Sequence, residues 1–294
     1  MEIQNNRRNF IRKAGVYTLL SQVPLLGWGK GFSTLQNEGA STSLAEGVKP
    51  AGEFSLLKLE KILPSYKFPL IAKFSTSSFK SHFALYNLYG NNVTEAGDFM
   101  LNAELNGKNQ QFGFTSSRLA SNGIRDRSRV YQYFVSGSVI CSNNVACSPQ
   151  KWNVSSKISL AEDGKAFGGT GMQNLGAVKG GEIHLNIGEK EIRKSFGTRT
   201  LSWKWGLIAV AQKMAEASVP EQQLAILDEF DAIYSRQIMK FRRKVTLDCG
   251  NERLIDFKVF ELTGDGVIPT VYWVDHMNRT VFVVSGMEAY VLKV

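Results

Sequence analysis

The chain of 294 residues contains few histidines and few cysteines, with three of each. His82, His184 and His276 are far apart in the sequence and form no His-x-x-His or His-Glu-x-x-His motif. Zinc sites are built from closely spaced histidine, cysteine or carboxylate ligands, so the sequence gives no support for a metal site. We interpret each histidine as a surface or satisfied core residue, and we expect neither a metal nor another cofactor.

The cysteines also lack the Cys-x-x-Cys spacing of zinc and redox motifs. Cys141 and Cys147 enclose a loop of five residues, which a disulfide could close in an oxidising compartment. The loop-entropy model gives so short a loop only about 2–3 kcal/mol of stabilisation. Cys249 is left over, and we expect it to be a free structural thiol.

Familiar catalytic motifs are missing as well. There is no Gly-x-Ser-x-Gly, the strand-to-helix turn of many hydrolases. The glycine-rich segment 167–176 lacks the lysine and hydroxyl residue of a phosphate loop, and a predicted strand follows it, so we expect a flexible loop. Asp228 and Asp231 are spaced like an exposed acidic helix face, and turn chemistry accounts for Asp265 and Asp275. The sequence therefore favours a protein that is not an enzyme.

A basic segment and an apolar run stand at the N-terminus. Arg7 and Arg8 open the sequence Arg-Arg-Asn-Phe-Ile-Arg, which Lys13 and an apolar run from Ala14 to Trp28 follow. Residues 5–28 resemble a twin-arginine signal. The resemblance implies recognition by the twin-arginine export machinery and a periplasmic or secreted location. The alternative is an amphipathic helix of a cytoplasmic protein. No apolar run reaches the roughly 20 residues of a membrane span, so we expect a soluble protein.

The net charge is positive but modest. Of the formal +9, a surplus of +3 lies in residues 1–40, which leaves +6 for the rest of the chain. Such a surplus on an exported protein suits anionic envelope surfaces or acidic glycans better than nucleic acid. It is equally compatible with no charged partner.

We expect residues 1–40 to be the signal and linker and residues 53–294 to form a single β-rich domain. Short apolar segments alternate with turns, and Asn106-Gly107 is a strong hairpin signal. Connections are too short for βαβ units, so the sheet should be mostly antiparallel. Strands are predicted over 81–89, 99–105, 111–115, 130–141, 154–160 and 182–187, and then over 253–262, 270–274, 280–285 and 288–294.

The period changes between residues 202 and 243, which predicts an inserted helical pair. The first helix carries an apolar stripe at helical spacing, formed by Leu207, Ile208, Ala211, Met214 and Ala215. The second should begin at the capping-box spacing of Ser218-Val-Pro-Glu221. Its stripe is Leu227, Phe230, Ile233, Tyr234 and Ile238.

The segments 264–275 and 279–286 resemble the closing hairpin of exported bacterial proteins of uncharacterised function. Those proteins are β-rich and often barrel-like, and their hairpin carries Trp-x-Asp, here Trp273-Val-Asp275. The resemblance implies a curved antiparallel sheet or partial β-barrel, packed with the two helices into a mainly β, α+β fold. It brings no catalytic residues. The last strand should lie within the sheet.

One alternation indicates a candidate site. Arg125, Arg127, Arg129, Tyr131 and Tyr133 would share one face of a single strand. On a concave sheet, guanidinium groups and phenols could hold an acidic sugar or a lipid headgroup. The alternative places the arginines in solvent and the tyrosines in the core.

Trp273 is a further aromatic that could stack against a ligand, although core packing is the default for such a residue. From these features we expect an exported envelope protein that binds a lipid or glycan ligand or has a structural role. The alternatives are a polysaccharide-acting hydrolase on a β scaffold and an interaction subunit of an envelope complex.

Overall fold

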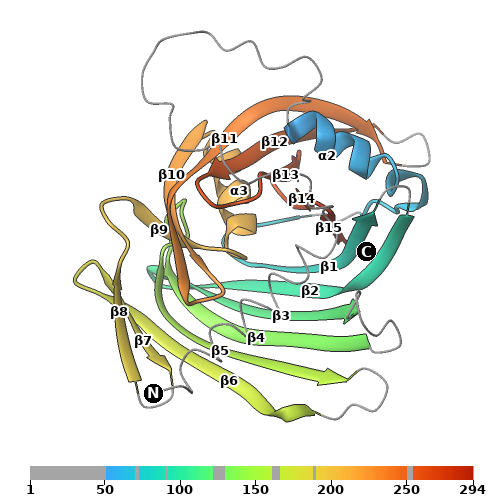
Figure 1. Cartoon of the computed structure of the whole chain (residues 1–294). Helices are drawn as coiled ribbons and strands as arrows, with labels where there is room; N and C mark the ends of the chain where they lie inside the picture. The colour runs from blue at the N-terminus through green and yellow to red at the C-terminus, as the bar shows by residue number, and fades with distance from the viewer. Residues whose placement is uncertain are drawn as a thin grey trace, which may run out of the picture.

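The computed structural model describes residues 51–69, 73–89, 92–121, 130–160, 166–187, 190–249 and 254–293. The twin-arginine segment, the linker up to residue 50 and Arg125, Arg127 and Arg129 lie outside these residues. The described part is mostly β, with one large curved sheet that does not close into a barrel (Figure 1).

The first half of the chain supplies eight successive antiparallel strands. They are β1 (Phe79–Tyr89), β2 (Asn92–Asn106), β3 (Asn109–Ser121), β4 (Val130–Ser142), β5 (Pro149–Leu160), β6 (Ala166–Lys179), β7 (Glu182–Ile187) and β8 (Lys190–Ser195). The hairpin predicted at Asn106-Gly107 joins β2 to β3.

The second half supplies seven strands and a helix. They are β9 (Thr200–Trp203), α3 (Leu207–Glu216), β10 (Glu221–Asp228), β11 (Ala232–Asp248), β12 (Leu254–Gly264), β13 (Thr270–Asp275), β14 (Thr280–Ser285) and β15 (Glu288–Leu292). The two halves join where β1 pairs with β15, so the last strand lies inside the sheet as predicted. Among these strands only β9 and β10 pair in parallel.

Two layers cover opposite faces of β12, β13 and β14. The segment with α2 (Ala51–Leu59) and the 3-10 turn η1 (Leu63–Ser65) packs on the convex face, where Tyr66 meets Phe282 with ring centroids 5.0 Å apart. On the concave face, the hydroxyl of Thr280 donates to the carbonyl of Ile208 in α3 over 3.1 Å. Every residue of β13 is buried because both of its faces are covered.

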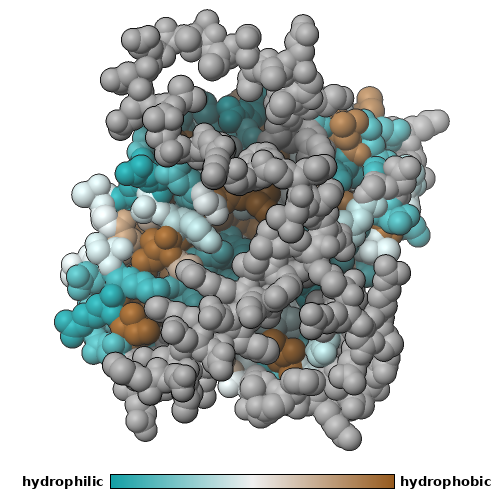
Figure 2. Space-filling view, viewed as in Figure 1, coloured by the Kyte–Doolittle hydropathy of each residue, from teal (hydrophilic) through white to brown (hydrophobic). Residues whose placement is uncertain are grey.

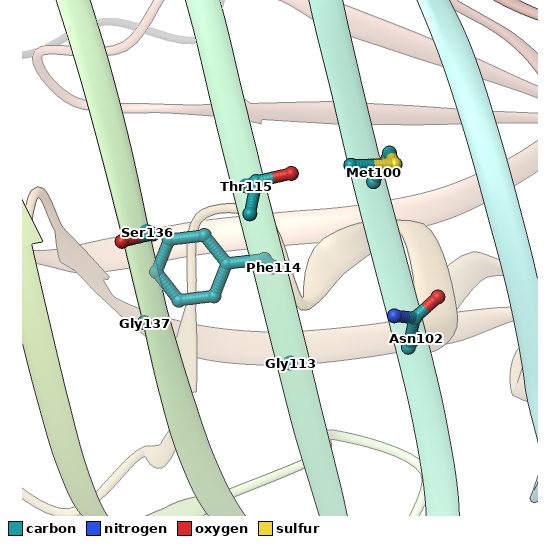
Figure 3. A pocket seen from close by; sticks show the side chains of 7 residues that line it. All are labelled: Met100, Asn102, Gly113, Phe114, Thr115, Ser136 and Gly137. Atoms are coloured by element: carbon teal, nitrogen blue, oxygen red, sulfur yellow. The ribbon is translucent and has the colours of Figure 1, made fainter.

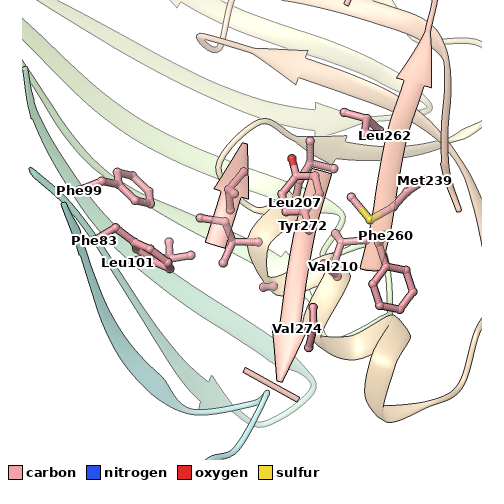
Figure 4. Close-up of a cluster of buried hydrophobic side chains, with 14 of the residues drawn as sticks. Phe83, Phe99, Leu101, Leu207, Val210, Met239, Phe260, Leu262, Tyr272 and Val274 are labelled. Carbon is pink, nitrogen blue, oxygen red and sulfur yellow. The ribbon is translucent and has the colours of Figure 1, made fainter. Parts of the chain in front are cut away.

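The helix α3 lies inside the curve of the sheet (Figure 1). Residues 207–215 are all buried, as expected of a helix surrounded by protein. Leu207 and Val210 pack beside Tyr272 and Phe260, while side chains of β1 and β2 face them from across the core (Figure 4). This confirms the first predicted helix.

The second predicted helix is wrong, because residues 221–248 form the hairpin of β10 and β11. Its apparent stripe combined residues from two strands and the turn between them. Leu227 pairs with Ile233 across the hairpin, and Phe230 lies in the turn. Proline 220 lies just before β10, where its missing N–H leaves the strand ladder intact.

The predicted glycine-rich loop at 167–176 is also wrong, because these residues lie in β6. Gly176 shows the reason for one glycine there. A Cβ atom at Gly176 would lie 2.2 Å from the indole ring of Trp152 on β5. The glycine therefore makes room for a buried tryptophan, and a sequence scan cannot separate this role from that of a flexible loop.

Candidate binding site on the concave face

The turn between β10 and β11 contacts strands from the other end of the curved sheet. The turn between β10 and β11 runs from Asp228 to Asp231, and the amide of Asp231 donates to the carbonyl of Asp228 over 3.1 Å. Glu229 and Phe230 both have positive φ, of 48° and 61°. This is the conformation of a type I′ hairpin turn, in which Asn-Gly is the favoured pair. Tertiary contacts must therefore hold a Glu-Phe pair in this turn.

Phe230 provides most of those contacts. Its ring lies in an aromatic cluster with Phe114, Trp152, Trp203 and Trp205, at centroid distances of 5.9, 5.8, 5.9 and 6.2 Å. Its carbonyl accepts a hydrogen bond from the side-chain amide of Asn174 in β6, at 2.9 Å. The turn thus joins β10 and β11 to strands far away in the sheet order.

Three charged side chains lie together at this turn. The amine of Lys204 lies 2.9 Å from a carboxylate oxygen of Asp228 and 3.9 Å from one of Glu229. The next residue, Trp205, is half-buried and packs against Phe114 at 4.7 Å. We call Lys204, Trp205, Asp228, Glu229 and Tyr133 the Lys204 cluster.

The charges in the Lys204 cluster influence one another. Burial lowers the pKa of Lys204, but the charges of Asp228 and Glu229 outweigh it and leave that pKa above its ordinary value. Burial raises the pKa of Glu229, Lys204 opposes the rise, and Asp228 and Asp231 add to it. Burial, with the nearby charge of Glu229, raises the pKa of Tyr133 to about 12. At neutral pH the cluster therefore offers an ammonium group and a phenol that still carries its proton.

A second ion pair lies on the same concave face. Arg118 of β3 pairs with Glu288 of β15. Tyr290, on the same face as Glu288, meets Phe99 edge-on at 5.8 Å. Lys204 and Arg118 both act on the pKa of Tyr290, which burial raises. Aromatic faces and hydrogen-bonding charges thus alternate along this part of the face, a composition suited to a polar ring-shaped ligand.

Of the predicted site residues, the structure describes the two tyrosines and Trp273. Tyr131 and Tyr133 lie in β4 and share a face of the strand with the buried Val135, as the pattern predicts. Tyr133 belongs to the Lys204 cluster. Trp273 does not, since it is fully buried and its ring meets Phe257 at 6.1 Å. Core packing, the default for this residue, is what the structure shows.

Sequence reasoning missed four residues of the Lys204 cluster. Lys204 and Trp205 follow a strand of only four residues, which is too short to give an alternating pattern. Asp228 and Glu229 lay within the wrongly predicted helix. The available signal was Asp-Glu-Phe-Asp between two apolar runs, which are β10 and the start of β11.

The histidines and cysteines lie elsewhere. His82 and His184 make surface pairs with Asp98 and Glu191, both at 2.8 Å. No group of three or more potential metal ligands occurs in the described part of the chain. Cys141, Cys147 and Cys249 are buried, and the structure shows them without a disulfide bond. Burial raises the pKa of the Cys147 thiol to about 11. A Cys141–Cys147 disulfide in an oxidising compartment stays a prediction.

A shallow groove of about 290 Å³ lies over Gly113 of β3, between Met100 and Asn102 of β2 and Ser136 of β4 (Figure 3). None of the residues that line it is charged. Figure 2 shows hydrophobic residues scattered among hydrophilic ones on the visible described surface, without a continuous apolar patch. The groove offers fewer directed contacts than the Lys204 cluster, so we regard it as the weaker candidate.

Comparison with known proteins supports the fold alone. No family model and no curated protein matches the sequence. A β-barrel-like protein of the domain of unknown function DUF1849 from Brucella abortus matches with a TM-score of 0.51 and 7% identity, over 75% of this chain and 96% of that one. A DUF1089 family protein from Pseudomonas aeruginosa matches over 74% and 94%, at 10% identity and a TM-score of 0.28.

The DUF1849 structure shares the barrel-like architecture of this chain. Its identity is too low to transfer a function. Among the described residues, no helix is both long and apolar enough to cross a membrane.

Proposed function

We propose that this protein is a ligand-binding module of the cell envelope and that the Lys204 cluster binds a glycan. The observation that carries the proposal is the half-buried Trp205 next to the ion-paired Lys204, whose side chain is 44% exposed, on a concave face. An aromatic ring can stack on a sugar, while an ammonium, carboxylates and a phenol can hydrogen-bond its hydroxyl or acidic groups.

A glycan fits the concave face better than a lipid chain. Pockets that enclose ligands of drug-like size have volumes of about 300–1,000 Å³ and are mostly apolar. Here α3 and the aromatic cluster around Phe230 fill the inner face. The groove over Gly113 lies on the opposite face of the sheet, because Met100 and Asn102 alternate with the buried Phe99 and Leu101, and it is shallow and partly polar. A ligand that lies on the Lys204 cluster therefore requires less rearrangement than one that must enter the core.

Two substitutions test the glycan proposal by isothermal titration calorimetry of the purified protein with neutral and acidic oligosaccharides. Lys204→Met keeps the length of the side chain but removes its charge, and Trp205→Phe keeps a ring in the core but reduces the stacking face. We expect Lys204→Met to weaken binding about tenfold or more, since one hydrogen bond to a charged group contributes about 1.5–3 kcal/mol. We expect Trp205→Phe to weaken it about two- to tenfold, since ring stacking contributes about 0.5–1.5 kcal/mol.

Matched controls are Lys240→Met, which removes an exposed amine 3.5 Å from Glu221, and Phe134→Ala, which removes an exposed ring. Both should bind as the unaltered protein does. If no oligosaccharide binds, or if Lys204→Met binds normally, the proposed function is wrong.

The proposed envelope location is tested at Arg7 and Arg8. We expect Arg7→Lys with Arg8→Lys to abolish export of a reporter fused to residues 1–52, because the resemblance implies recognition of the arginine pair itself rather than of its charge. Cell fractionation measures the exported fraction. The control, Lys13→Arg, also keeps the charge and should leave export intact. Normal export of the double variant would show that another route is used.

A hydrolase is the second candidate, because two carboxylates, Asp228 and Glu229, lie 2.9 and 3.9 Å from the Lys204 amine and burial raises the pKa of Glu229. Glycosidases need one carboxyl group with a raised pKa as the acid and a second carboxylate beside the scissile bond. Asp228 is the adjacent carboxylate. Release of reducing sugar from a polysaccharide panel, lost in Glu229→Gln, would establish this activity in place of simple binding.

A further inference from the structure

The concave face carries a second polar group next to the Lys204 cluster. In the pairing of β3 with β4, Arg118 lies directly opposite Tyr133, a member of that cluster. Directly opposite residues of an antiparallel pair share a face, so Arg118 lies on the same side of the sheet as Tyr133. Its guanidinium pairs with Glu288 of β15, and the two side chains are 24% and 33% exposed. Both are therefore accessible to a ligand on this face.

Aromatic rings connect the Lys204 cluster to this pair. The ring of Trp205 lies 6.0 Å from that of Phe99, and the ring of Phe99 lies 5.8 Å from that of Tyr290. Phe99 is fully buried, whereas Trp205 and Tyr290 are half-buried and reach the surface. Burial raises the pKa of Tyr290, and the charges of Lys204 and Arg118 both oppose the rise, so its phenol lies near both groups.

The two polar groups are separated by more than the length of one sugar ring. Trp205 packs against Phe114 of β3 at 4.7 Å, and Arg118 follows Phe114 by two alternations on the same face of that strand. A strand rises about 3.3 Å per residue, so roughly 13 Å separate these two positions of β3. A chain of two or three sugar rings covers this length, and a single ring does not.

We propose that Arg118 and Glu288 form a second subsite, so that the concave face binds a glycan chain rather than a single sugar; the proposal rests on glycan binding at the Lys204 cluster. One ring stacks on Trp205, and the Arg118–Glu288 pair hydrogen-bonds a ring further along the chain. A guanidinium beside a carboxylate supplies donors and acceptors, and a sugar hydroxyl is both. Once the first subsite is occupied, binding at the second is intramolecular, so affinity rises with chain length.

Calorimetric titration with sugars of increasing length tests the second subsite. The probes are N-acetylglucosamine and galacturonic acid, each as the single sugar and as its linear dimer, trimer and tetramer. In the series that binds, we expect the affinity to rise about tenfold or more from the single sugar to the trimer. Arg118→Met should remove this rise and lower the affinity for the trimer to near that for the single sugar. Lys204→Met should weaken binding at every length.

Two further variants separate a subsite from a structural role of the pair, which also joins β3 to β15. Glu288→Gln keeps the size of its side chain and gives the same comparison if Arg118→Met does not fold. Arg193→Met removes the exposed partner of Glu191 on β8, 3.3 Å away, and should leave every affinity unchanged.

The outcomes distinguish the second subsite from the proposed function. An affinity that does not rise with chain length, or an equal loss for single sugar and trimer in Arg118→Met, would overturn the second subsite and leave glycan binding at the Lys204 cluster standing. Binding of no probe at any length would overturn the proposed function, and the second subsite with it.

Discussion

Replacing Arg279 with methionine is expected to lower the free energy of unfolding by about 3–5 kcal/mol, the usual effect of leaving one charge of a buried pair alone. Asp275 and Arg279 are 0% and 4% exposed, and the Arg279 guanidinium makes contacts of 3.0 and 2.9 Å to one carboxylate oxygen of Asp275. Methionine fills much of the same space but leaves the Asp275 charge buried without its counter-charge.

The pair also ties the closing hairpin to the N-terminal segment. Asp275 accepts hydrogen bonds from the amides of Met277 and Arg279, at 3.0 and 2.9 Å, which fixes the turn between β13 and β14. Arg279 donates to the carbonyl of Pro69 at 2.8 Å and lies 5.2 Å from the centre of the Phe68 ring. Its loss should therefore loosen the convex layer as well as the turn.

Thermal and urea unfolding measure the effect, with a fall in Tm of about 6–20 °C expected for a domain of this size. The control is Arg236→Met, which breaks a pair with Asp265 at 3.7 Å whose partners are 76% and 79% exposed. Exposed pairs contribute about 0–1 kcal/mol, so this variant should unfold nearly as the unaltered protein does. Equal effects of the two substitutions would show that burial does not govern the contribution of the Asp275–Arg279 pair.

Much of the fold can be predicted from the sequence, because alternating apolar and polar residues indicate a strand with one buried face. β1 and β4 each have a buried face, and their apolar pattern places them within a few residues. β14 is buried on both faces, and a continuous apolar run places it instead. Asp275 was assigned correctly to turn chemistry, although its buried partner Arg279 was not foreseen. That partnership depends on the N-terminal segment with Phe68 and Pro69, far away in the sequence.

The failures share a physical cause. Residues 221–248 form two strands joined by a turn without glycine or asparagine, so the strongest local hairpin signal is missing. Tertiary contacts hold Glu229 and Phe230 in the left-handed conformation instead. The Lys204 cluster depends on that turn, so the error in the fold also concealed the candidate site.

Replacing Phe230 is expected to have the second large effect on the free energy of unfolding, because of its contacts. Phe230→Ala should destabilise the protein by about 3–5 kcal/mol, because it empties the centre of a cluster of four aromatic rings. The matched control is Phe134→Ala, at a ring that is 40% exposed and should cost well under half as much.

A comparison of Phe230→Ala with Phe230→Gly separates packing from backbone strain. Both remove the ring, but glycine adopts the positive φ of this position without the roughly 1 kcal/mol penalty of an L-residue. Phe230→Gly should therefore be the more stable of the two by about that amount, the reverse of the order expected at a helix or strand interior. If urea unfolding shows Phe230→Ala to be the more stable variant, Phe230 does not have the left-handed backbone conformation.

Hydrogen exchange tests whether Phe230 closes the sheet. The turn is joined to β6 through Asn174 and to β8 through Lys194, so loss of the aromatic anchor should raise amide exchange in β6, β7 and β8. The paired strands β13 and β14 lie under α3 and α2 and should keep their protection. A uniform rise across all strands would mean that Phe230 contributes only to global stability. A rise confined to β6–β8 and to the β10–β11 turn would show that one aromatic side chain holds the two ends of the curved sheet together.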